Sequence, residues 1–156
     1  MRKKLTGTIA ALATAGVLAI LLPGPAWAAS GPQPASGTFR ETSVTVDSKT
    51  VVDGNTIVVV TVSGITTGTF DGPFTETDTV VIQPDGSVTL AGMGTQSGTL
   101  GTCGSGSAPY VTGAQGTASA RRGFILAIGQ VASAVVSFTV NAVTGEGTYV
   151  GTYHCT

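Results

Sequence analysis

The sequence predicts an all-β protein, built as a small antiparallel β-barrel. Charged residues make up only 10% of the chain, whereas threonine, valine and other strand-forming residues are abundant. The 23 glycines, several of them inside strand-like stretches, are typical of the sharp bends of a closed barrel. An immunoglobulin-like β-sandwich is the alternative. The spacing of the two cysteines fits an inter-sheet bridge, but the tryptophan expected between them is missing.

The first 28 residues are typical of a secretory signal peptide. Basic residues precede an apolar run from Leu5 to Leu22, and Ala26-Trp27-Ala28 has the small-x-small pattern that signal peptidase cleaves. An uncleaved membrane anchor is the alternative, since an apolar run of this length can just span a bilayer. The prolines of Pro23–Pro25 argue against it. We therefore expect cleavage after Ala28, export from a bacterial cell to the extracellular space, and no membrane span in the remaining chain.

The charge of the exported chain limits its partners. Residues 29–156 keep four basic residues and all eight acidic ones, which gives a net charge of −4. Such a surface lacks the basic patch that nucleic acid requires and the polybasic cluster that anionic lipids attract. Residues 29–36 are small residues and proline, which predict a flexible leader. Residues 37–156 have the length of a single domain.

Five strands are expected from their β-branched or alternating residues. Asp71-Gly72-Pro73 should bend the third strand, because proline cannot donate to a β-ladder. Pro84-Asp85-Gly86-Ser87 should form the turn to the fourth strand, because proline presets φ and glycine accepts positive φ. The last strand is expected to pair with residues 135–141. The five segments are 38–48, 55–64, 66–83, 88–101 and 148–155.

The segment between the last two of these strands is harder to assign. Residues 102–109 suggest a Gly/Ser loop that carries Cys103, and residues 110–123 are ambiguous. Residues 124–140 could form one strand or two, or begin with a short helix. We favour strand, because the glycine, valines and threonine of this segment lower its helix propensity.

A short motif recurs along the chain: SGTF at residues 36–39, TGTF at 67–70 and SGTL at 97–100. Because side chains alternate along a strand, each copy places its glycine and its large apolar residue on the same face. If the large residue points into the barrel, the glycine does too, and it makes room for a bulky side chain on a neighbouring strand. We interpret the motif as one strand type reused around a barrel.

These strands resemble those of small secreted bacterial β-barrels akin to the allene-oxide-cyclase barrel superfamily. The resemblance is carried by Gly37-Thr38-Phe39, by Gly68-Thr69-Phe70 and by the segment from Thr144 to Gly151, TGEGTYVG. Residues 102–135 do not contribute to it. The resemblance implies a short antiparallel barrel with an apolar interior, and it assigns no catalytic residue to this chain.

Cys103 and Cys155 are the only cysteines, and in an oxidising compartment we expect them to form a disulfide rather than remain free thiols. The single histidine, His154, precedes Cys155, and adjacent residues on a strand point to opposite faces. We therefore expect an anchored terminal strand, with no catalytic His–Cys pair. A metal site is not expected either, because it needs several such ligands.

Three acidic residues are the candidate ligand-binding residues. Glu41 follows Phe39, and Glu76 and Asp78 follow Phe74, in steps of two residues, so on regular strands they share the face of these phenylalanines. Carboxyls in a low-dielectric interior have raised pKa values and can take part in acid–base chemistry. The alternative is that a bulge or the rim of the barrel leaves all three in solvent.

The remaining motifs narrow the function. The sequence contains no nucleophile elbow, phosphate-binding loop or zinc-protease helix, and we expect no cofactor. Arg121-Arg122 could clamp an anion, but we expect it in a solvated turn beside Gly123. The sequence favours a secreted, non-catalytic barrel that binds a small hydrophobic ligand. The alternatives are an isomerase-like enzyme that uses one of the three carboxyls, and an extracellular interaction protein with an exposed strand edge.

Overall fold

The computed structural model describes residues 31–156, and the predicted signal peptide lies outside this range. Within it the chain forms eight strands and one short 3-10 helix, η1. In chain order the elements are β1 (Gln33–Val52), β2 (Asn55–Gly68), β3 (Phe70–Ile82), β4 (Ser87–Leu100), η1 (Gly101–Cys103), β5 (Ser105–Thr117), β6 (Ala120–Ile128), β7 (Ala132–Asn141) and β8 (Glu146–Cys155).

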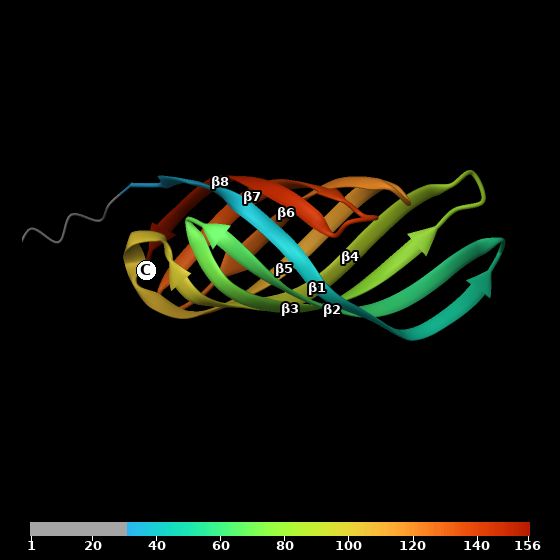
Figure 1. Ribbon diagram of the computed structural model, residues 1–156, viewed down its shortest axis with the longest axis horizontal. Coiled ribbons are helices and arrows are strands. Elements are labelled where there is room, and N and C mark those ends of the chain that lie inside the picture. The colour runs from blue at the N-terminus through green and yellow to red at the C-terminus, as the bar shows by residue number, and fades with distance from the viewer. Residues whose placement is uncertain (1–30) are drawn as a thin grey trace, which may run out of the picture.

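The strands form one closed antiparallel barrel (Figure 1). Each strand pairs with the next along the chain, and β8 pairs back with β1. The predicted barrel is confirmed, and the alternative β-sandwich is wrong, because a single sheet closes on itself instead of two sheets packing face to face. Among the residues that the structure describes, no helix is long and apolar enough to cross a membrane.

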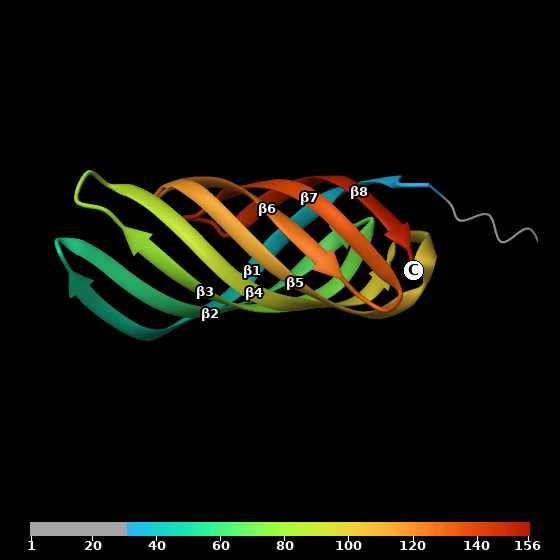
Figure 2. The same ribbon diagram turned by 180° about the vertical axis from the view of Figure 1, so that it is seen from behind.

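The two ends of the barrel differ. β1 to β4 extend past β5 to β8 at the end that carries the β1–β2 and β3–β4 turns, which we call the mouth (Figures 1 and 2). Beyond Arg40, β1 pairs with β2 alone. The opposite end, which we call the packed end, holds η1 and the C-terminus. There Leu100, Ala132 and Tyr153 are buried.

Glycines on one strand face aromatic rings on the next. Gly37 lies opposite Tyr149, and Gly64 lies opposite Phe74. In both pairs a Cβ on the glycine would collide with the ring. Phe39, two residues after Gly37, packs edge-on against Phe74 with ring centroids 6.3 Å apart. For the first copy of the Gly-Thr-Phe motif, the expectation is confirmed, because Gly37 leaves the space that the Tyr149 ring fills. The interpretation as one reused strand type is wrong for the second copy, which spans the turn between β2 and β3.

The predicted flexible leader is wrong for residues 33–36. β1 begins at Gln33, and its first residues pair with β8, from Gln33 opposite Tyr153 to Ser36 opposite Val150. Ala35 is only 1% exposed. The small residues that suggested flexibility instead pack against the terminal strand, a contact made across more than a hundred residues of sequence.

The prediction that residues 66–83 form one strand is wrong. The chain reverses direction at Gly68, whose φ of +113° favours glycine. The expected irregularity at Gly72-Pro73 is present, because the pairing of β3 with β4 is interrupted there. The predicted turn at Pro84 and the pairing of β8 with residues 135–141 are both confirmed.

The segment that was hard to assign is also built of strands. Most of the predicted Gly/Ser loop belongs to η1 and β5, so a loop over all of 102–109 is wrong. The preference for strand over helix in 124–140 is confirmed, since this segment forms most of β6 and β7 with a short connection at 129–131. β5 and β6 pair with each other and complete the wall (Figure 2).

Candidate functional site

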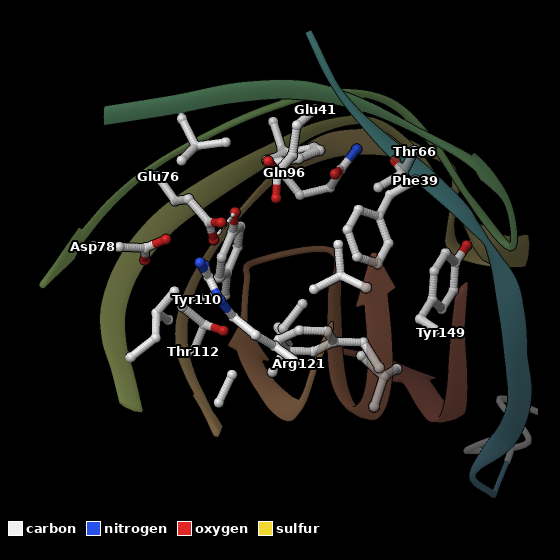
Figure 3. Close-up of a pocket in the computed structure, with 18 of the residues that line it drawn as sticks. Phe39, Glu41, Thr66, Glu76, Asp78, Gln96, Tyr110, Thr112, Arg121 and Tyr149 are labelled. Atoms are coloured by element: carbon white, nitrogen blue, oxygen red, sulfur yellow. Dashed lines mark hydrogen bonds between the residues drawn. The ribbon is translucent and has the colours of Figure 1, made fainter. Parts of the chain in front are cut away.

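A cavity of about 300 Å³ lies inside the barrel (Figure 3). Its volume is at the lower end of the range of about 300–1,000 Å³ that is usual for small-molecule sites. Most of the lining is apolar and comes from all eight strands. This apolar lining includes Phe39, Val62, Phe70, Phe74, Val80, Leu90, Ala127, Ala134, Val136 and Phe138.

The three acidic residues predicted to share one face all line this cavity. Glu76 and Asp78 follow Phe74 on β3, where the alternation of side chains points them inward. Glu41 lies on β1 just before a break in the β1–β2 register. Its backbone N–H donates to the carbonyl of Gly145, in the β7–β8 turn, at 2.8 Å. The alternative of three solvated carboxyls is wrong for this structure.

Glu76 is held in a polar network. The Tyr110 hydroxyl donates to Oε2 of Glu76 at 3.0 Å. Gly94, which lies opposite both residues on β4, leaves the space that the Tyr110 ring occupies. Burial raises the pKa of Glu76 from 4.5 to about 8, the Asp78 charge adds to the rise, and the Tyr110 hydrogen bond opposes it. Glu76 is therefore protonated at neutral pH.

Asp78 is more deeply buried, with only 2% of its surface exposed. Burial raises its pKa to about 6 and the Glu41 charge adds to this, whereas Arg121 and a hydrogen bond from Glu76 lower it. Its Oδ1 atom has no hydrogen-bond partner within residues 31–156. That atom occupies the space above Gly92 where any other residue would place its Cβ. An unpaired buried acceptor is unusual, because burial removes the water molecules that would donate hydrogen bonds to it, and most buried acceptors have another donor instead.

Arg121 is a cavity-lining residue whose position differs from the one predicted from the sequence. The predicted solvated turn is wrong for it, because Arg121 is the second residue of β6 and its side chain lines the cavity. Figure 3 shows the side chain extending toward Glu76 and Asp78. Its positive charge lowers the pKa of Glu41 against the rise caused by burial. Arg122, next along the strand, is exposed as predicted.

The phase of β6 explains this error. Arg121, Ile125 and Ala127 point inward, whereas Phe124, which is 54% exposed, points out. Hydrophobicity alone predicts the opposite phase, with the phenylalanine inside. No signal within β6 could have identified Arg121, because the hydrophobic alternation of this strand favours the opposite phase.

Cys103 and Cys155 form a disulfide with an S–S distance of 2.06 Å, so the predicted bridge is confirmed. His154 is exposed and lies outside the cavity lining, which leaves no His–Cys pair. In the part of the chain that the structure describes, no three His, Cys, Asp or Glu side chains are grouped to hold a metal ion.

The polar groups occupy the part of the cavity nearer the mouth, and Phe39 and Tyr149 occupy another part (Figure 3). This arrangement suits a molecule with an apolar body and one polar group. Comparison with known proteins adds no family: no protein-family model matches the chain, and no curated protein matches it. The resemblance to the allene-oxide-cyclase barrel superfamily stays a prediction.

Proposed function

We propose that this protein is exported and binds one small, largely apolar molecule inside its barrel. The observation that carries the proposal is the internal cavity, whose lining is mostly apolar and whose charged groups gather in one part of it. Small-molecule sites commonly combine an apolar lining with a few polar groups that orient the ligand. The disulfide is consistent with export, because such bonds persist in oxidising compartments.

Two neighbouring residues of β6 provide a matched test of an internal site. Ala127 lines the cavity, and Leu126 points to the outer surface. Ala127→Phe should weaken the binding of pyrene, a neutral apolar fluorophore, at least about tenfold, because the added ring fills the space that the ligand needs. Leu126→Phe adds a ring outside the barrel and should leave the dissociation constant unchanged. Fluorescence titration measures both constants.

Two results of this titration contradict an internal site. One is that pyrene does not bind the wild-type protein. The other is that Leu126→Phe changes the affinity as much as Ala127→Phe, which would place the dye on the outer wall. Circular dichroism and urea unfolding of both variants show whether each barrel is folded before its affinity is interpreted.

An isomerase-like enzyme is the second candidate, and the pKa values of the two carboxyls favour it. Because the pKa of Asp78 is about 6 and the pKa of Glu76 is about 8, Asp78 is largely ionised and Glu76 is largely protonated at neutral pH. Such a pair can act as a base and an acid toward one bound molecule. The two candidates predict different outcomes. A binding protein releases its ligand unchanged, whereas an enzyme converts the ligand to a product.

A further inference from the structure

The polar part of the cavity carries more acidic than basic groups. Glu41, Glu76 and Asp78, which we call the acidic cluster, face the single guanidinium of Arg121. The other polar side chains beside the cluster are uncharged, and they belong to Tyr110 and Thr112 on β5 and to Gln96 on β4. Arg121 can offset one carboxylate, so the cluster keeps an excess of acceptor oxygens and of negative charge.

The hydrogen bonds within the cluster leave one strong acceptor unused. Tyr110 donates to Oε2 of Glu76 at 3.0 Å. Oδ1 of Asp78 is without a donor, and Nε of Arg121 is without an acceptor, in the described chain. The guanidinium therefore does not complete the hydrogen bonding of Asp78 through this nitrogen. Burial makes an unpaired carboxylate oxygen a strong attractor for a cationic donor.

We propose that the ligand is an apolar primary amine, whose ammonium group donates to Asp78 while its hydrocarbon part occupies the apolar part of the cavity. This inference rests on the proposed function, that the cavity binds a small molecule. It adds the chemical class of the polar group and the residue that recognises it.

The chemistry of the acidic cluster predicts how tightly ligands with three different polar groups should bind. An ammonium supplies three donors and a positive charge, so it pairs with Asp78 and offsets the excess negative charge. A hydroxyl supplies one donor and leaves the charge unchanged. A carboxylate supplies only acceptors, and it adds a fourth acid beside the three already present, where like charges repel. The expected order of affinity is amine, alcohol, carboxylate.

The test uses three probes with the same hydrocarbon chain: octylamine, octan-1-ol and octanoate. Each is titrated into the wild-type protein at pH 7 by isothermal calorimetry, below its aggregation concentration. We expect octylamine to bind about tenfold more tightly than octan-1-ol, and octanoate to bind most weakly. If octan-1-ol binds as tightly as octylamine, or octanoate binds more tightly, the inference is wrong but the cavity still binds ligands. If none of the three binds, the proposed function fails as well.

Asp78→Asn should remove the preference for octylamine over octan-1-ol and preserve the affinity for octan-1-ol. Asp71→Asn is the matched control, because Asp71 is exposed and outside the cavity lining. It should keep the full preference. A preference that survives in Asp78→Asn contradicts the assignment of Asp78.

A second measurement uses only the wild-type protein, so its result does not depend on whether a variant folds. A bound ammonium stabilises the ionised form of Glu76, so octylamine binding at pH 7 should release protons, whereas octan-1-ol should release none. Calorimetry in two buffers with different ionisation enthalpies measures the number released. Equal proton release for both probes would place the amine away from the acidic cluster.

Discussion

Replacing Cys103 and Cys155 together by serine is expected to lower the free energy of unfolding by about 4 kcal/mol. The two cysteines are 52 residues apart in the sequence, so their bond closes a long loop and removes many conformations from the unfolded chain. The bond also joins the end of β8 to η1, at the packed end of the barrel. Urea unfolding followed by far-ultraviolet circular dichroism measures the change.

The wild-type protein treated with a reductant is the control for this substitution. It should lose nearly the same free energy as the double serine variant, because both lack the same covalent link. A loss below about 1 kcal/mol in both samples would contradict the prediction, since it would mean that the barrel does not depend on this link.

Glu76→Gln is expected to stabilise the barrel at pH 9 by roughly 2–4 kcal/mol and to leave its stability at pH 5 nearly unchanged. Burial raises the pKa of Glu76 from 4.5 to about 8, so the folded protein holds a proton that the unfolded chain releases. The wild-type barrel therefore loses stability as the pH rises from about 4.5 to about 8, and loses little more above that range. Glutamine resembles the protonated carboxyl, because its amide oxygen can accept from Tyr110 and it cannot ionise.

Urea unfolding between pH 5 and pH 9 tests this prediction. Glu146→Gln is the matched control, because Glu146 is an exposed carboxyl outside the cavity lining. This variant is expected to follow the wild-type profile. A Glu76→Gln profile parallel to the wild type would show that Glu76 does not titrate inside the barrel. Asp78, whose pKa burial raises to about 6, leaves a smaller dependence in the variant between about pH 4 and pH 6.

The fold could be predicted from local patterns, because alternation and turn residues act between neighbours in the sequence. The turn at Pro84 and the disulfide are examples. The errors occurred where distant strands decide the outcome. Ala35 is ordered by pairing with β8, and the chain reverses at Gly68 although both flanking segments look like strand. Neither effect has a signal within its own segment.

The candidate site shows the same division. Glu76 and Asp78 could be placed from their spacing behind Phe74, because β3 is regular at these positions. Arg121 could not be placed with the same reasoning. The inward phase of β6 is opposite to its hydrophobic pattern and depends on the register with β5 and β7. The volume of the cavity could not be predicted, because it depends on how aromatic rings from several strands pack together.

The most direct test of an internal ligand site is methyl NMR spectroscopy of the protein during titration with pyrene. We expect the methyl signals of Ala127 and Val136, which line the cavity, to shift with the bound fraction. The methyl signals of Val135 and Val150, on the outer surface, should stay in place. Shifts confined to the outer methyls, with those of Ala127 and Val136 unchanged, would contradict a binding site inside the barrel.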